Sequence, residues 1–197
     1  AEIASVVGKA PLGQLVKRPI PMFKDFGLRD YPDIRQSAKG DTLFCRLPYN
    51  CQFTPYLKVE APEGNTIYMQ TDNYRGGGPE NVRAEYITRD GTQEYESYGW
   101  MSGHEMWYIV PEGVKILEVK YRETGYDTEF AGSFHCNDPF LNELWKRSAR
   151  TLYITMRDNY MDCPERERAQ WWGDEVNELG EAFYALSTSS HQLAVKG

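Results

Sequence analysis

The residues best suited to chemistry in this sequence lie in a short segment between positions 162 and 174. The segment carries four carboxylates, two guanidinium groups and two adjacent indoles, and those singled out here are Asp162, Glu167, Asp174, Arg166, Arg168, Trp171 and Trp172. A carboxyl group can protonate a glycosidic oxygen, and flat aromatic faces can hold a sugar ring. The segment therefore predicts carbohydrate chemistry.

The same residues also allow a purely structural interpretation. Asp162 and Asp174 can cap helices, charged neighbours can form ion pairs at helical spacing, and the two tryptophans can belong to a core. Adjacent indoles beside Gly173 make a poor core, however, because at least one ring must face outward or into a cleft. Arginines among acids also favour an arranged network, which can keep one carboxyl protonated while its neighbours stay ionised. We therefore favour the functional interpretation.

The composition argues against several other classes of function. The net charge is -7 and no basic stripe is present, whereas proteins that neutralise nucleic-acid phosphates normally carry one. No apolar run approaches the roughly 20 residues of a membrane helix, and the first residues do not read as a secretion signal. We expect neither nucleic-acid binding nor membrane insertion.

The cysteines and histidines do not predict a metal site. The four cysteines, at 45, 51, 136 and 163, form no CxxC pair, and the three histidines lack the spacing of metal ligands. Cys45 and Cys51 can pair in an oxidising compartment, but we expect them to be free and partly buried. We expect no metal and no cofactor.

The chain divides into three parts that must position this segment. Residues 1–40 contain four prolines and little periodicity, which is typical of an extended arm or linker. Residues 41–132 contain short alternating runs separated by turns, which predict an antiparallel β-sandwich. Within this part an Asp-Gly turn at 90–91 predicts a hairpin, and the glycine-rich stretch at 74–79 is expected to be a surface loop, because it lacks the ending of a phosphate loop.

From residue 133 onward the pattern changes to that of helices. Asp138-Pro139 begins a first helix, predicted to run to about Arg157 with an apolar face at Leu141, Leu144, Trp145, Ala149, Leu152 and Met156. A second helix is predicted from about Asp174 to the Ser/Thr cluster at 187–190, with a solvated face at Glu175, Glu178 and Glu181. The charged segment thus lies on the connection between two helices, a common place for catalytic groups.

This segment resembles the signature of the bacterial α-L-rhamnosidases of glycoside hydrolase family 78. The resemblance is carried by residues 159–168, which read Asn-Tyr-Met-Asp-Cys-Pro-Glu-Arg-Glu-Arg, and by Trp171, Gly173 and Asp174. It extends over about residues 60–190, through matching stretches at 119–126 and 134–142. It implies that residues 133–197 are the N-terminal, incomplete part of an (α/α)6 catalytic barrel. One departure is that many members carry an extra residue between Arg166 and Glu167.

The resemblance implies a role for each matching residue. Glu167 matches the general acid that protonates the oxygen leaving the rhamnose anomeric carbon. Asp162 and Asp174 match acids that hold sugar hydroxyls and shape the environment of that acid. Arg166 matches an arginine that binds hydroxyls or orients the acids, and Trp171 matches an aromatic wall of the sugar subsite.

Two residues of the segment match no role in the family. For Trp172 we expect a packing residue, and for Glu165 a solvated carboxylate. The family inverts the anomeric configuration, so a second carboxylate must activate water roughly 6.5–9.5 Å from the acid. In the family that base lies later in the barrel, and residues 175–197 offer no replacement. We therefore expect a fragment that holds the acid without the base and is poorly active or inactive alone.

The implied parent enzyme removes terminal α-L-rhamnose from polysaccharides or glycosides by inverting hydrolysis. Its expected partner is a rhamnose-containing glycan or glycoside, and family habit implies a periplasmic or extracellular location. Two alternatives remain open. One is a glycosidase on the same helical barrel with another sugar specificity, which substrate screening would separate. The other is a non-catalytic carbohydrate-binding module, which would bind sugar without turnover.

Overall fold

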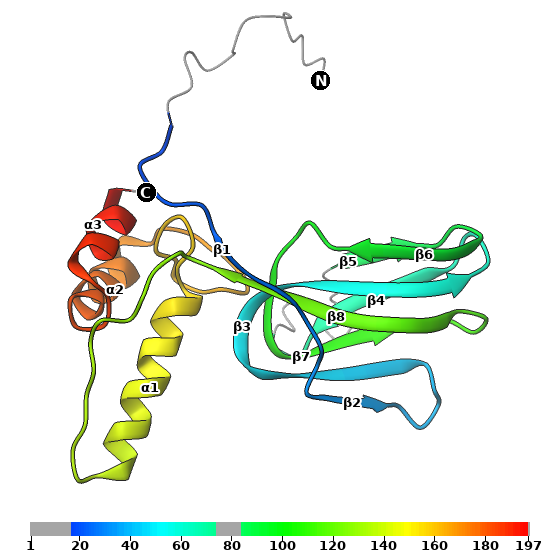
Figure 1. Ribbon diagram of the computed structural model, residues 1–197, viewed down its shortest axis with the longest axis horizontal. Helices are drawn as coiled ribbons and strands as arrows, with labels where there is room; N and C mark the ends of the chain where they lie inside the picture. Colours follow the sequence, from blue (N-terminus) through cyan, green and yellow to red (C-terminus); the bar gives the residue numbers. More distant parts are fainter. Residues whose placement is uncertain (1–16, 74–83, 197) are drawn as a thin grey trace, which may run out of the picture.

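The fold is an antiparallel β-sheet with three helices beyond one of its ends, in a computed structural model that describes residues 17–73 and 84–196 (Figure 1). The strands are β1 (Lys24–Arg29), β2 (Asp33–Gln36), β3 (Thr42–Ala61), β4 (Thr66–Thr71), β5 (Ala84–Ile87), β6 (Gly91–Glu96), β7 (Met101–Ile109) and β8 (Lys115–Gly125). The helices are α1 (Pro139–Ile154), α2 (Trp172–Ala185) and α3 (Thr188–Lys196). The glycine-rich stretch at 74–79 lies outside the described residues.

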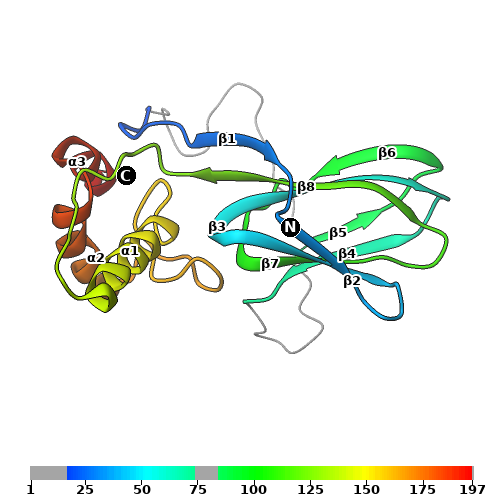
Figure 2. The same ribbon diagram turned by 60° about the horizontal axis from the view of Figure 1, so that its bottom comes forward.

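The long strand β3 organises the sheet. The strand order is β1-β8-β3-β7-β4-β5, with β2 and β6 also paired to β3. The first part of β3 pairs with β2 and β7, and the last part pairs with β6 and β8. The register with β7 shifts between Arg46 and Cys51, where Pro48 cannot donate a ladder hydrogen bond. One sheet therefore curls on itself (Figure 2), and the expected pair of sandwich layers is a single hydrogen-bonded sheet.

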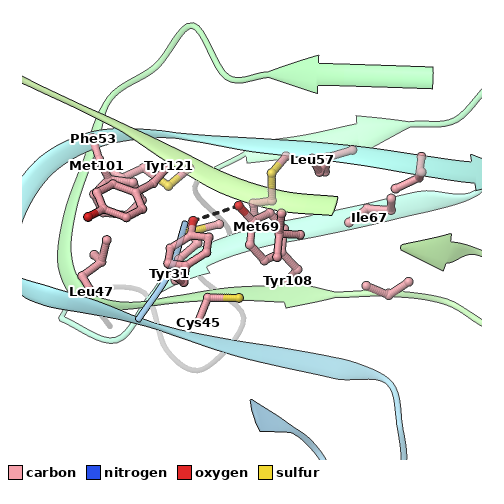
Figure 3. Packing of buried hydrophobic residues seen from close by; sticks show 14 of the residues in the cluster. Tyr31, Cys45, Leu47, Phe53, Leu57, Ile67, Met69, Met101, Tyr108 and Tyr121 are labelled. Atoms are coloured by element: carbon pink, nitrogen blue, oxygen red, sulfur yellow. Dashed lines mark hydrogen bonds between the residues drawn. The ribbon is translucent and has the colours of Figure 1, made fainter. Parts of the chain in front are cut away.

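The two halves of the curled sheet share one apolar core. Buried side chains from both halves fill it, among them Phe53, Leu57, Met69 and Tyr108 (Figure 3). The hydroxyls of Tyr31 and Tyr108 lie 2.9 Å apart in this core, so each polar tip has a partner. Cys45 and Cys51 are buried free thiols, and burial raises the pKa of Cys45 to about 12.

Two sequence expectations for the sheet are wrong. Residues 24–29 and 33–36, expected to be irregular, form β1 and β2. The sequence pattern of β1 is interrupted because its register shifts around Gly27. The sequence of β2 shows no apolar alternation because all four of its residues are exposed. The Asp-Gly turn at 90–91 does not make a hairpin, since β5 pairs with β4 and β6 pairs with β3. The side chain of Gln93 bonds the backbone of Arg89 and Gly91 instead. These hydrogen bonds satisfy backbone polar groups of the turn without strand pairing.

The helices pack around a second apolar cluster. Asp138 caps α1 by accepting a hydrogen bond of 2.9 Å from the Phe140 N–H, as predicted, although the helix ends at Ile154. The Ser/Thr cluster begins a third helix, because Ser187 Oγ accepts from the Ser190 N–H at 3.3 Å as a cap does. The cluster comprises Tyr126, Leu152, Tyr153, Met156, Tyr160, Ala182, Ala185, Leu186 and Ala194. No helix in the described ranges is both long and apolar enough to cross a bilayer.

Buried polar contacts join the sheet to the helices. Gln52 Nε2 donates to the carbonyls of Ile154, the last residue of α1, and Met156 just after it, at 2.8 and 3.0 Å. Gln52 Oε1 accepts from Arg157 at 2.8 Å. Arg150 of α1 bonds the Asn50 carbonyl at 2.7 Å and the carboxylate of Glu123 at 3.1 Å. The residues that follow α1 are therefore held against the sheet.

Candidate active site

The predicted site residues lie on the irregular connection between α1 and α2. Residues 162–169, here called the acid loop, form a closed loop within this connection. Its base is closed twice, because the Asp162 N–H donates to the Ala169 carbonyl at 3.0 Å and the Ala169 N–H donates to Asp162 Oδ1 at 2.9 Å. Asp162, predicted to bind sugar hydroxyls, thus also holds the loop closed.

The carboxylate of Glu167 sits between two donors of the same loop. Arg166 Nε donates to Glu167 Oε1 at 2.7 Å, and a second guanidinium nitrogen bonds the same oxygen. Cys163 Sγ donates to Glu167 Oε2 at 3.1 Å. The Arg166 contact, followed by the Cys163 contact, lowers the pKa of Glu167 to about 2. The predicted acid is therefore an ionised carboxylate at neutral pH in this arrangement, and Arg166 orients it.

Two side chains of the acid loop attach it to the sheet. Glu165 Oε1 accepts from Asn73 Nδ2 at 2.9 Å and from Ser102 Oγ at 3.3 Å. The expectation of a solvated Glu165 is therefore wrong, because this carboxylate is an anchor. Arg168 donates to the carbonyls of Pro164 at 2.9 Å and Trp100 at 3.1 Å. Both anchors reach β7 or the residue before it.

The remaining predicted residues lie at the start of α2. The Trp171 N–H donates to the Ala169 carbonyl at 3.1 Å, which ties it to the base of the acid loop. Trp171 is 56% exposed and Trp172 is 78% exposed, so Trp172 is not the packing residue expected. Asp174 lies in the first turn of the helix, where a carboxylate is favoured by the helix dipole. Its carboxylate bonds no other described residue.

The structure thus groups the predicted residues in two places. The acid loop brings Asp162, Arg166 and Glu167 together, and the start of α2 holds Trp171 and Asp174 immediately after it. One trio in the described ranges, Asp162, Cys163 and Glu167, places possible ligand atoms within 4.8 Å of one another. We assign it no metal, because Arg166 already supplies the positive charge at Glu167.

A buried carboxyl on α2 was missed from the sequence. Glu178 was expected on a solvated face, yet Glu178 Oε2 and Glu175 Oε1 are buried with no hydrogen-bond partner in the described structure. Burial is the largest cause that raises the pKa of Glu178 to about 7, and nearby carboxylates add to it, whereas a Thr155 hydrogen bond lowers it. Helical spacing could have signalled this position, since Glu178 lies four residues before the buried Ala182.

Comparison with known proteins places this geometry in a family. Residues 129–191 match the family described as the bacterial alpha-L-rhamnosidase 6 hairpin glycosidase domain. This segment matches the bacterial α-L-rhamnosidases. The matched rhamnosidase segment contains α1, the whole acid loop and α2. No curated protein matches the chain.

Solved structures of rhamnosidases resemble the chain over most of its length. The rhamnosidase of family GH78 from Bacillus sp. GL1 is 27% identical, with a TM-score of 0.65 over 76% of this chain and 17% of its own. The α-L-rhamnosidase from Dictyoglumus thermophilum is 18% identical, with a TM-score of 0.72 over 93% of this chain and 22% of its own. The enzyme from Aspergillus terreus is 21% identical, with a TM-score of 0.68, covering 89% of this chain and 22% of its own. The chain thus spans about one fifth of the length of these relatives.

Proposed function

We propose that this chain supplies the acid-bearing part of an α-L-rhamnosidase that removes terminal α-L-rhamnose from polysaccharides or glycosides. The observation that carries the proposal is the acid loop. It holds the Glu167 carboxylate in place, and it lies inside the segment that matches the rhamnosidase family. Bonds at the base of the loop and to the sheet fix its position, which is what acid catalysis requires of a proton donor.

In this proposal the hydrolysis inverts the anomeric carbon. Glu167 gives its proton to the leaving oxygen, Asp162 and Asp174 hold sugar hydroxyls, and Trp171 offers its exposed ring as a subsite wall. A base from a later part of the whole enzyme activates the attacking water from the opposite face. The substrate is a rhamnose-containing glycan or glycoside, with no role for nucleic acid, membrane insertion or a cofactor.

The bond from Arg166 must weaken before Glu167 can act as an acid. A carboxyl with a pKa of about 2 carries no proton near neutral pH, whereas an efficient general acid has a raised pKa. Sugar hydroxyls that engage Arg166 would draw it from the carboxylate, and covering side chains would desolvate the site. Both changes raise the pKa of Glu167, so we propose that substrate and a complete domain together produce the protonated acid.

We also propose that the chain divides into three parts. Residues 1–40 are an arm that contributes two strands, residues 41–132 are the main sheet, and residues 133–197 are the start of an (α/α)6 barrel. Large apolar side chains of the helices support this division, because Phe140, Val176, Phe183 and Tyr184 are each at least 63% exposed. Further helices would bury them. The proposed location, periplasmic or extracellular, follows from the substrate class.

The test is hydrolysis of an aryl α-L-rhamnoside by this chain and by an extended protein that adds a complete helical domain. Aryl glucoside, galactoside and arabinoside serve as controls for sugar specificity. We expect rhamnoside turnover by the extended protein and little or none by the chain alone. Preference for another sugar would identify a different six-hairpin glycosidase.

A second candidate function is sugar binding without turnover. The low pKa of Glu167 favours it, because a permanently ionised carboxylate can accept hydrogen bonds from sugar hydroxyls but cannot protonate a leaving group. Rhamnose binding by the extended protein, measured by calorimetry, without hydrolysis of any aryl glycoside would support this candidate over the enzyme.

A further inference from the structure

One cation of the acid loop reaches away from the site and onto the sheet. The Arg168 guanidinium lies over the Trp100 ring, 3.6 Å from its centroid, and donates to the Trp100 carbonyl. The same guanidinium donates to the Pro164 carbonyl at 2.9 Å. Arg168 therefore joins the residue before β7 to the turn that carries Glu167.

The backbone of Arg168 supports a specific role for this contact. Its φ is 53°, which makes it the one non-glycine residue in the described ranges with a positive φ. An arginine in this region carries a backbone cost that persists only where surrounding contacts require it. The stack on Trp100 and the two carbonyl bonds are such contacts.

The platform beneath Arg168 is itself fixed. Arg157 lies over the same Trp100 ring at 4.7 Å and is buried, with one nitrogen bonded to Gln52 Oε1 at 2.8 Å. Trp100 therefore contacts both Arg157, which bonds Gln52 of β3, and Arg168 of the acid loop. Each cation contact with the ring is attractive, and burial strengthens it.

We infer that Arg168 is a positioning residue for Glu167, with Trp100 as its support on the sheet. The Arg168–Pro164 bond closes the same short turn that the Cys163–Glu167 bond crosses. Loss of the first bond lets the turn open, and the second bond then lengthens. This inference rests on the proposed function, because it assigns Arg168 to the acid of that reaction, although the geometry can be tested without turnover.

The first test measures the titration of Glu167 in the whole chain, from the carboxyl carbon chemical shift in NMR. We expect a midpoint near pH 2 in the unsubstituted chain. In Arg168→Lys, which keeps the charge but loses the planar fork, and in Trp100→Ala, the midpoint should rise by about one unit or more toward the ordinary value of about 4.3. Trp100→Phe keeps a ring and should give a smaller rise.

Matched controls are Arg147→Lys on an exposed face of α1 and Trp107→Phe within the sheet. Neither should move the Glu167 midpoint. Circular dichroism and thermal melting identify variants that do not fold, and Arg168→Lys decides the question if Trp100→Ala unfolds. An unchanged midpoint in folded Arg168→Lys would overturn the inference.

The second test is kinetic and uses the extended protein. Arg168→Lys should lower kcat about 10- to 100-fold for rhamnosides with poor leaving groups and leave KM within about twofold, because misplacing an acid affects the transition state more than binding. A rise in KM with unchanged kcat would contradict positioning. Absence of turnover by the unsubstituted extended protein would contradict the proposed function alone, and the titration would still decide the role of Arg168.

Discussion

At the scale of single residues, the acid loop keeps the Glu167 carboxylate ordered by surrounding it with donors. Arg166 and Cys163 both stabilise its charged form. Since the folded pKa lies below the ordinary value, this contribution to stability is present above about pH 4.5 and is lost as the pH falls toward 2. The same contacts that hold the carboxylate in place also keep it deprotonated.

Glu167→Gln in the extended protein tests the role of this residue as an acid. Loss of the proton donor should slow hydrolysis about 10²- to 10⁴-fold for rhamnosides with poor leaving groups. Activated aryl rhamnosides need little acid assistance and should lose much less. Comparison of kcat/KM for the two substrate classes is the measurement, and equal losses would exclude Glu167 as the acid.

Glu178→Gln tests the buried carboxyl of α2. The raised pKa means that the folded state loses stability as the pH rises from about 4.5 to 7, that the full penalty persists above pH 7, and that no penalty exists below about pH 4.5. The substitution should stabilise the chain at pH 8 by on the order of 1 kcal/mol, after allowance for partial solvent exposure, and by nearly nothing at pH 4. Urea unfolding at both pH values measures this difference.

The exposed Glu181→Gln on the same helix is the control for Glu178. Its effect should stay within about 0.5 kcal/mol at either pH. An equal stabilisation by Glu178→Gln at pH 4 and pH 8 would show that the carboxyl does not titrate in the folded state.

The candidate site could be located from the sequence because its residue types and spacing are dense and local. The contacts that anchor it could not be predicted, because Glu165 bonds Asn73 and Ser102, which lie 92 and 63 residues earlier in the chain. Glu178 was misjudged because a charged side chain on a helix reads as solvated. Local pattern therefore identified the candidate groups for chemistry, while tertiary contacts determined which side chains hold them.

At the scale of secondary-structure elements, the segment before α1 passes very close to α2. The N–H groups of Ala131 and Gly132 both donate to the Ala185 carbonyl, at 3.0 and 3.1 Å. A Cβ atom added at Gly132 would lie 1.6 Å from the Tyr184 carbonyl oxygen. Only glycine allows this approach.

Gly132→Ala should therefore destabilise the chain by about 1–3 kcal/mol or more, because backbone must move to relieve the clash. Gly180→Ala is the matched substitution within α2, where an added Cβ meets no atom within 4 Å. It should stabilise by roughly 0.5–1 kcal/mol through helix propensity. Urea unfolding measures the change in the free energy of unfolding for each variant. A loss of stability in both variants would contradict the steric explanation.

Elements with strong local signals were predicted well. The capped start of α1 follows from the Asp138-Pro139 pattern alone. The part of β3 that follows Arg46 does not follow from the sequence pattern, because Pro48 and Pro55 argue against a central strand. β2 forms by pairing with β3. Its four residues are all exposed, so they show no apolar alternation from which a strand could be predicted.

At the scale of the whole molecule, two apolar clusters are joined by a small buried polar junction. Gln52 is its centre, because one side chain bonds two carbonyls at the end of α1 and the guanidinium of Arg157. Such contacts couple the folding of the helices to that of the sheet. We therefore expect a single cooperative unfolding transition.

Gln52→Ala should break this coupling. Buried groups left without partners cost about 1–3 kcal/mol each, so we expect a loss of roughly 2–3 kcal/mol. Tryptophan fluorescence and circular dichroism should then report separate transitions in urea. The exposed Gln36→Ala, which loses only a bond to the Gly40 carbonyl, is the control. Coincident transitions in Gln52→Ala would show that other contacts carry the coupling.

The placement of the acid-loop anchors has a consequence for the order in which the protein is made. Asn73, Trp100 and Ser102 all precede the acid loop in the chain, so they leave the ribosome first. Domains generally fold N-terminal first during synthesis. The sheet can therefore form a template while the helices are still being translated, and the acid loop settles onto a surface that already exists.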